Sequence, residues 1–229
     1  MTTCMLQPHL DVRDIELERG ERLLFSGLSF QASAGSLVRL TGANGTGKTS
    51  LLRVLTGLMQ PTVGGVFYCG QDIHKLREDF HKDLVYIGHL NGVKDDLSAI
   101  ENVRIAARMG NRIASEQELE SALQQVGLAH FVDQMTGELS QGQRRRVALA
   151  RLFVSSAKPV WILDEPFTAL EVKSASNLAL QIAEHVRRGG IVIYTTHQEC
   201  EIPVGESARV MVDVSSFSPE AHGKRMVAA

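Results

Sequence analysis

Hydrophobic residues along the chain fall into short runs typical of buried strands, separated by stretches in which they recur at helical spacing. Leu51, Leu55 and Leu58 show the helical spacing, and Pro61 ends that stretch. The same spacing returns between residues 175 and 186, before Gly189. The strand-length runs are residues 10–17, 28–32, 36–41, 66–69, 84–87, 160–163 and 191–195. This alternation predicts an α/β protein with a largely parallel sheet.

The stretch from about residue 91 to 155 has a helical pattern throughout. Within it, Ser115 and Glu118 have the spacing of a capping box, and Gly127 ends the helix that follows. We therefore expect one domain over residues 1–229, in which a helical subdomain at about 91–155 interrupts the α/β core. The polar, unpatterned stretch at about 215–229 is expected to be a poorly ordered tail.

The composition is that of a globular chain with a substantial core, since 44% of the 229 residues are hydrophobic. Lys and Arg number 24 against 26 Asp and Glu, which gives a formal net charge of −2. This balance argues against nucleic acid as a partner, because such binders carry a basic excess. No apolar run reaches the roughly 18–20 residues that cross a bilayer. Any work at a membrane would therefore need another chain to cross it.

The glycine-rich segment between the run at 36–41 and the next helical stretch fits the pattern G-x-x-x-x-G-K-[ST]. Glycines allow successive backbone N–H groups to face phosphate oxygens, and the following helix adds its positive N-terminal end. Lys48 is expected to reach the β and γ phosphates, and the Thr49 hydroxyl to coordinate Mg²⁺. A GTPase would also need an N-K-x-D segment, which the chain lacks. The phosphate loop consists of Gly42, Ala43, Asn44, Gly45, Thr46, Gly47, Lys48 and Thr49.

Two carboxylates, Asp164 and Glu165, follow the apolar run at 160–163. Asp164 is placed to hold Mg²⁺ through water, and Glu165 to polarise a water in line with the γ phosphate. His197 ends the next buried run, and we interpret it as a γ-phosphate sensor. These residues and the phosphate loop predict a nucleotide hydrolase.

The segment Leu139-Ser-Gln-Gly-Gln143 precedes a helical run. Ser140 is a natural helix N-cap and Gly142 allows close backbone approach, so this helix start is a second anion-binding end. The chain thus has one phosphate loop and a second helix N-terminus suited to phosphate. This combination suggests two copies that face head to tail, so that Ser140 and Gly142 of each copy close over the nucleotide of the other. Arg144, Arg145 and Arg146 are interpreted as the solvated face of the helix, with packing of their aliphatic stems.

These segments, in this order over nearly the whole chain, resemble the LSGGQ signature, phosphate loop, acidic strand and histidine of ABC ATPases. The resemblance implies a RecA-like core with a small antiparallel β part and a helical subdomain, and a homodimer with two ATP molecules at its interface. It further implies that Ser50 joins the phosphate loop in binding phosphate and Mg²⁺ and that Ser140, Gly142 and Gln143 contact ATP. Glu165 would be the catalytic base and His197 the switch histidine.

Three positions depart from the usual ABC ATPase pattern. Arg19 lies near the place of the aromatic residue that stacks on adenine, and its guanidinium is expected to stack instead. His89 replaces the glutamine that connects the γ phosphate to the membrane partner, and its titration would make that coupling sensitive to pH. Glu171 replaces the aspartate that follows the acidic strand.

A narrower resemblance is to the ATP-binding subunits of bacterial haem exporters in c-type cytochrome maturation. It rests on the segments Trp161–Leu170, Ile87–Lys94, Leu97–Asn102 and Gly189–Gln198, and on the histidine at 89. It implies membrane permease partners, indirect action on a periplasmic haem chaperone, and a peripheral location on the cytoplasmic face of the inner membrane. No direct haem binding is expected. The alternatives are the ATPase of another ABC transporter, a soluble ABC ATPase of a cytosolic assembly scaffold, and a P-loop kinase.

Overall fold

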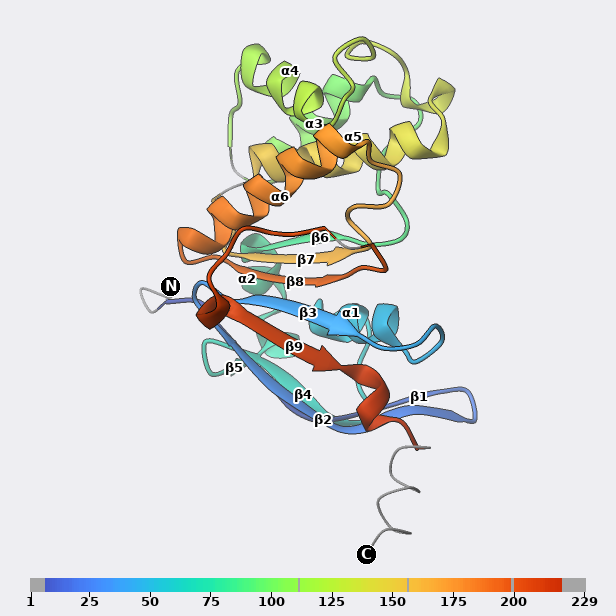
Figure 1. Cartoon of the computed structure of the whole chain (residues 1–229), viewed down its shortest axis with the longest axis vertical. Helices are drawn as coiled ribbons and strands as arrows, with labels where there is room; N and C mark the ends of the chain where they lie inside the picture. The colour runs from blue at the N-terminus through green and yellow to red at the C-terminus, as the bar shows by residue number, and fades with distance from the viewer. Residues whose placement is uncertain (1–6, 111, 156, 199, 220–229) are drawn as a thin grey trace, which may run out of the picture.

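The computed structural model describes residues 7–110, 112–155, 157–198 and 200–219, which form two β-sheets and a group of helices (Figure 1). One sheet is antiparallel, with the strand order β2-β1-β4-β5. Its strands are β1 (His9–Arg19), β2 (Arg22–Ser33), β4 (Val63–Tyr68) and β5 (Gln71–Asp72). Short turns connect β1 to β2 and β4 to β5, whereas β1 and β4 pair although β2, β3 and α1 lie between them in the chain.

The second sheet is parallel, with the strand order β6-β7-β8-β3-β9. Every residue of β7 and β8 is buried, which is why both strands read as continuous hydrophobic runs. The carboxyl ends of parallel strands lie at one edge, so the loops after β3, β6, β7 and β8 are brought together there. The strands are β3 (Leu37–Thr41), β6 (Leu84–Ile87), β7 (Val160–Asp164), β8 (Ile191–Thr195) and β9 (Arg209–Asp213).

The parallel sheet separates two hydrophobic cores. Val160 and Ile162 of β7 pack with α1 (Lys48–Leu55) and the antiparallel sheet. Trp161 and Leu163 point to the other face, where they pack with helices of the upper part of Figure 1. These helices are α3 (Ala99–Met109), α4 (Glu116–Gln125), α5 (Gln141–Val154) and α6 (Val172–Arg187). Strand β7, which ends at Asp164, is thereby packed against a hydrophobic core on each face.

Elements close to the predicted runs are present, and the predicted capping box at Ser115 and Glu118 begins α4. The helix α2 (Ile73–Asp83) and the strands β5 and β9 were not predicted. Short 3₁₀ helices cover Thr136–Glu138, Glu206–Ala208 and Val214–Phe217. The last of these corrects the expectation of a poorly ordered tail from residue 215, because pairing of β9 with β3 holds its start. Residues 220–229 lie outside the described residues.

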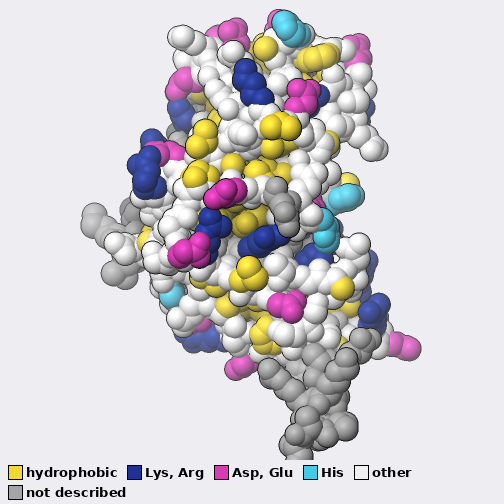
Figure 2. Space-filling model, viewed as in Figure 1, with side chains coloured by type: hydrophobic (Ala, Val, Ile, Leu, Met, Phe, Trp, Pro, Cys, Tyr) yellow, Lys and Arg dark blue, Asp and Glu magenta, His cyan; other side chains and the backbone are white. Residues whose placement is uncertain are grey.

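Charged side chains of both signs are interspersed on the face shown in Figure 2, with hydrophobic side chains across its middle. Exposed hydrophobic residues include Val172 and Leu180 on α6 and Met211 on β9. A groove of about 710 Å³ between α4 and α6 is lined by Gln117, Gln125 and Gln181, among others. It lies apart from the edge at which the predicted site residues gather. Within the described part of the chain, we find no helix of the length and apolarity needed to span a membrane.

Candidate active site

The phosphate loop connects β3 to α1, and glycine conformations shape it. Gly47 has φ +98° and is the N-cap of α1, and a Cβ there would lie 2.9 Å from Cε1 of Phe25. No side chain caps α1, and its first turn contains no acidic residue. The first-turn N–H groups are therefore available to an anion at the positive end of the helix.

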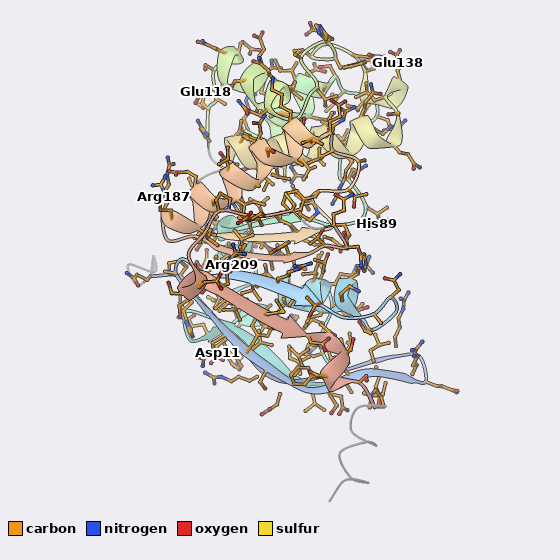
Figure 3. The ribbon with its side chains drawn as sticks, in the orientation of Figure 1. Asp11, His89, Glu118, Glu138, Arg187 and Arg209 are labelled. Atoms are coloured by element: carbon orange, nitrogen blue, oxygen red, sulfur yellow. The ribbon has the colours of Figure 1, made fainter. Side chains whose placement is uncertain are left out.

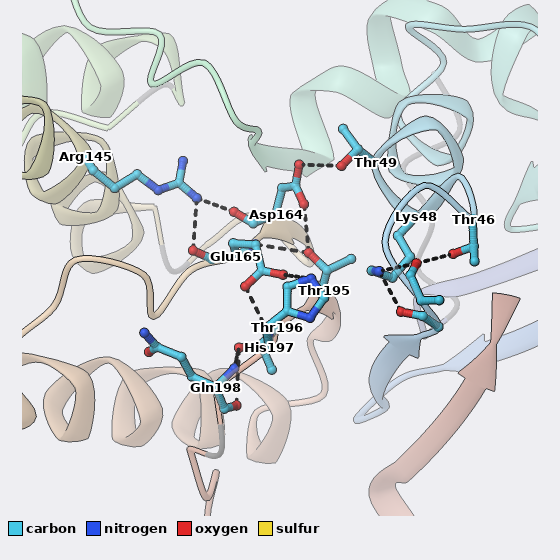
Figure 4. Close-up of polar contacts among 12 residues, drawn as sticks. Thr46, Lys48, Thr49, Arg145, Asp164, Glu165, Thr195, Thr196, His197 and Gln198 are labelled. Atoms are coloured by element: carbon cyan, nitrogen blue, oxygen red, sulfur yellow. Dashed lines mark hydrogen bonds and ion pairs between the residues drawn. The ribbon is translucent and has the colours of Figure 1, made fainter. Parts of the chain in front are cut away.

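Lys48 bends back over this loop. Its Nζ donates to the carbonyl oxygens of Gly42 at 2.7 Å and Ala43 at 3.0 Å, while the Thr46 hydroxyl donates to Ala43 O at 2.9 Å (Figure 4). Among the described residues, no carboxylate forms an ion pair with Lys48. An uncompensated ammonium group beside free helix amides is suited to binding a polyphosphate.

Asp164 is 5% exposed, and both of its carboxylate oxygens accept hydrogen bonds. The Thr49 hydroxyl donates to Oδ2 at 3.1 Å, and the Thr195 hydroxyl donates to Oδ1 at 2.7 Å. The strand register accounts for the second contact, since Asp164 pairs with Thr195 across β7 and β8. Thr195 Oγ1 also accepts the backbone N–H of Glu165 at 3.0 Å. This threonine, which the sequence analysis missed, orients both acidic residues.

Glu165 has a left-handed backbone, with φ +51°. This conformation is uncommon for residues other than glycine and is found most often where function requires it. The Glu165 carboxylate accepts the backbone N–H of His197 at 3.1 Å, and the His197 ring lies 3.5 Å from it through Nε2. The Glu165 side chain is 26% exposed and the His197 side chain 56%. Both therefore remain accessible to water and substrate.

Arg145 of α5 connects the residues that follow β6 to the end of β7. Its guanidinium donates to the carbonyl oxygens of Gly88 and Asp164, and to Glu165 O at 3.4 Å. Burial lowers the pKa of Arg145, against the opposing effect of nearby Asp164 and Tyr86. The expectation of a solvated face is therefore wrong for Arg145, which is 8% exposed, whereas Arg144 and Arg146 are partly exposed. Its place three and four residues before buried Ala148 and Leu149 was the available signal.

His89 lies at the same edge of the parallel sheet (Figure 3). Ile87 pairs with Leu163, so Gly88 and His89 follow beside Asp164 and Glu165. His89 is exposed. Arg19 is also exposed; it is the last residue of β1 and pairs with Arg22 of β2. Among the described residues, no hydrogen bond or ion pair joins either side chain to the phosphate loop, so the roles of His89 and Arg19 stay predictions.

The signature segment forms a complete capping box at the start of α5. Gln143 N–H donates to Ser140 Oγ at 3.2 Å, and Ser140 N–H donates to Gln143 Oε1 at 2.8 Å. Gly142 lies beside Ala169, whose Cβ would be 3.5 Å from a Cβ at position 142. In Figure 1, α5 belongs to the upper group of helices and α1 to the lower part of the molecule. The fold thus gathers Lys48, Asp164 and His197 at one edge of the parallel sheet, whereas Ser140 is exposed at the start of α5 in the helical group.

The donor set fits a hard divalent cation bound together with a nucleotide. No cluster of three or more His, Cys, Asp or Glu that could hold a metal occurs among the described residues. Thr49 and Asp164 instead place one hydroxyl and one carboxylate at hydrogen-bond distance, next to the phosphate loop. Mg²⁺ is commonly bound in this way, by one or two protein oxygens, substrate phosphates and water.

Comparison with known proteins gives consistent results. The family profile described as "ABC transporter" matches residues 25–168. The chain is 49% identical to the cytochrome c biogenesis ATP-binding export protein CcmA of Escherichia coli O157:H7, over 88% of this chain and 95% of that protein. It is 48% identical to CcmA of Dechloromonas aromatica, over 86% of this chain and 96% of that protein.

Solved structures share the fold. An ABC transporter ATP-binding protein from Pyrococcus furiosus has a TM-score of 0.76 and 24% identity, covering 92% of this chain and 99% of that chain. An ATP-binding cassette solved as a dimer in a post-hydrolysis state with ADP and phosphate has a TM-score of 0.72 and 20% identity. That alignment covers 90% of this chain and 94% of that chain.

Proposed function

The chain belongs to the ABC transporter family as an ATP-binding, ATP-hydrolysing subunit, and on this premise we propose that it powers the haem exporter complex of c-type cytochrome biogenesis. The contact set of Thr49, Asp164, Glu165 and His197 supports the hydrolytic role. Identity of 49% along 95% of an export protein of cytochrome c biogenesis supports the pathway.

ATP would bind with its phosphates in the loop formed by residues 42–49. Lys48 would exchange the carbonyl oxygens of Gly42 and Ala43 for the β and γ phosphate oxygens, a charge-assisted contact that is stronger than a neutral one. Ser50 is buried, so its contribution would come from its backbone amide in the first turn of α1. Arg19 would lie against the base.

Thr49 and Asp164 are the residues that would hold Mg²⁺, with Ser50 beside them on α1. The ion would neutralise negative charge on the phosphates. Thr195 has its own task in this arrangement, because its hydroxyl fixes one oxygen of Asp164 and leaves the other directed at Thr49.

Glu165 is the general base of the proposal. Its carboxylate would accept a proton from the attacking water as the oxygen approaches the γ phosphorus. His197 holds this carboxylate through its backbone N–H and places its ring at the same edge of the sheet, where it would contact the γ phosphate.

A second copy of the chain would complete each site. Ser140, Gly142 and Gln143 lie at the start of α5, whose N-terminal amides and positive end are suited to phosphate. Because Ser140 is exposed and α5 belongs to a different part of the molecule from α1, these residues would contact the ATP of the partner in a head-to-tail dimer with two nucleotides at the interface.

The membrane partners of the proposal are the permease subunits of the exporter, which place this chain on the cytoplasmic face of the inner membrane as a peripheral subunit. His89 would connect the ATP site to these permease subunits. It directly follows Gly88, whose carbonyl oxygen accepts a hydrogen bond from the same Arg145 guanidinium as the carbonyl oxygen of Asp164. ATP hydrolysis by this chain would act on a periplasmic haem chaperone indirectly, through the permease subunits, without haem binding by this chain.

The test is an affinity pull-down of the Glu165→Gln chain with ATP from detergent-solubilised native membranes, with Lys48→Ala as the matched control. ATP-dependent recovery of haem-handling membrane subunits is expected with the first variant and not with the second. Recovery of another permease would retain the ATPase role and overturn the haem assignment. Recovery of soluble proteins alone would favour a cytosolic assembly scaffold.

A further inference from the structure

The 3₁₀ turn at Val214–Phe217 contacts the phosphate loop from outside. The backbone N–H of Ala43 donates to Oγ of Ser215 at 3.1 Å, although the two residues are 172 positions apart in the chain. The carbonyl oxygen of Ala43 accepts from Lys48 and Thr46 at the same time. The N–H and the carbonyl oxygen of Ala43 are therefore both hydrogen-bonded, and Ser215 is the partner that lies outside the phosphate loop.

The same turn lies in van der Waals contact with the first glycine of the loop. A Cβ on Gly42 would be 2.7 Å from Ser215 Oγ and 3.3 Å from the Ser215 backbone nitrogen. Gly42 also has φ +135°, which side-chain-bearing residues rarely adopt. The approach of the turn is thus close enough that only glycine fits at the entry to the loop.

The position of Ser215 is itself fixed by the residues around it. Thr41 pairs with Asp213 across β3 and β9, so the loop and the turn leave the sheet side by side. Ser215 N–H donates to Asp213 Oδ1 at 3.0 Å, and Ser216 Oγ donates to Asp213 O at 2.7 Å. Val214 is fully buried. The hydroxyl is therefore presented to Ala43 by a turn with internal hydrogen bonds and a buried anchor.

From this geometry we infer that Ser215 is a positioning residue for nucleotide binding, which holds the Gly42–Ala43 end of the phosphate loop. The inference rests on the proposed function. When phosphate draws the Lys48 ammonium away from the carbonyls of Gly42 and Ala43, the loop loses two of its internal hydrogen bonds. The contact to Ser215 remains and keeps the loop in the conformation that accepts phosphate.

The kinetic test compares Ser215→Ala with Ser215→Thr and with Ser216→Ala. Ser215→Ala should raise the KM for ATP about fivefold, the effect of one lost hydrogen bond, and leave kcat at saturating ATP within about twofold of wild type. Ser215→Thr keeps the hydroxyl and should restore the wild-type KM. Ser216→Ala removes one hydrogen bond inside the same turn but keeps the hydroxyl that reaches Ala43, so it should raise KM by clearly less than Ser215→Ala does. An unchanged KM in Ser215→Ala, or an equal rise in Ser216→Ala, would overturn the inference.

A second readout needs no ATP. The Ala43 amide of the full-length chain should exchange its hydrogen several times faster in Ser215→Ala than in wild type or in Ser216→Ala, as measured by NMR. Equal exchange in all three proteins would overturn the contact itself. A wild-type chain that bound no ATP would instead overturn the proposed function, so the two failures are distinguishable.

Discussion

His197 contacts both carboxylate oxygens of Glu165: its backbone N–H donates to Oε2 at 3.1 Å, and its Nε2 lies 3.5 Å from Oε1. Two contacts from one residue fix the plane of the carboxylate. They also connect the ends of β7 and β8.

Glu165→Gln should bind ATP and hydrolyse it about 10²–10⁴-fold more slowly, because an amide cannot accept the proton of the water. The amide oxygen can still accept from the His197 backbone, so the fold should be unchanged. Single-turnover hydrolysis and gel filtration with ATP measure this, and an ATP-bound dimer should accumulate. Hydrolysis at the wild-type rate would remove Glu165 as the base.

Lys48→Ala should abolish measurable nucleotide binding, because it removes the positive charge that lies over the phosphate loop. Lys82→Ala is the matched control, since Lys82 forms an ion pair with Asp79 on the exposed side of α2. Titration with a fluorescent ATP analogue measures both variants. Equal affinity in the two would contradict the assignment of the loop.

The sequence could predict features that are encoded locally. The runs at 160–163 and 191–195 are visible because strands buried on both faces are hydrophobic at every position. The phosphate loop is visible because its glycines and lysine have a fixed spacing. Arg145 was misread, because its partners are backbone carbonyls 57 and 19 residues away, which composition does not reveal. Strand β9 and Ser215 were missed for the same reason, since only pairing with β3 brings them to the loop.

Ser140→Asn should separate the two roles of Ser140, which are to cap α5 and to contact the nucleotide of the partner. Asparagine is a good N-cap, so the thermal stability should match wild type, whereas Ser140→Ala should lose about 1 kcal/mol. Both variants should bind ATP normally and hydrolyse it slowly, because the damaged contact lies across the proposed dimer. Thermal melts and kcat measured together test this, and wild-type hydrolysis in both variants would exclude the head-to-tail arrangement.

Arg145→Met should lower the free energy of unfolding by about 2–4 kcal/mol, because it leaves the buried carbonyls of Gly88 and Asp164 without donors. Arg187→Ala is the control, on a side chain that is 75% exposed, and should change stability by less than about 0.5 kcal/mol. Urea unfolding measures the difference. Similar small losses in both variants would show that Arg145 is not a structural connection.

Acid should destabilise the protein through His185, which stacks on Trp161 with ring centroids 3.8 Å apart. Burial lowers the pKa of His185 from 6.5 to about 4, and nearby Arg188 adds to this, against the hydrogen bond with Pro159 O. As the pH falls, His185 therefore binds a proton near pH 6.5 in the unfolded chain but only near pH 4 in the folded chain. Stability is fully present above this window and is lost as the pH falls through it.

Between pH 7.5 and 5, this one residue should account for about 2 kcal/mol of the loss in the free energy of unfolding. His185→Phe keeps an aromatic ring beside Trp161 and removes the titration, so its stability should fall less steeply over the same range. Urea unfolding of both proteins at several pH values measures the difference between the two slopes. Parallel slopes would mean that His185 is protonated equally in the folded and unfolded chains, which its 4% exposure and its stacked ring argue against.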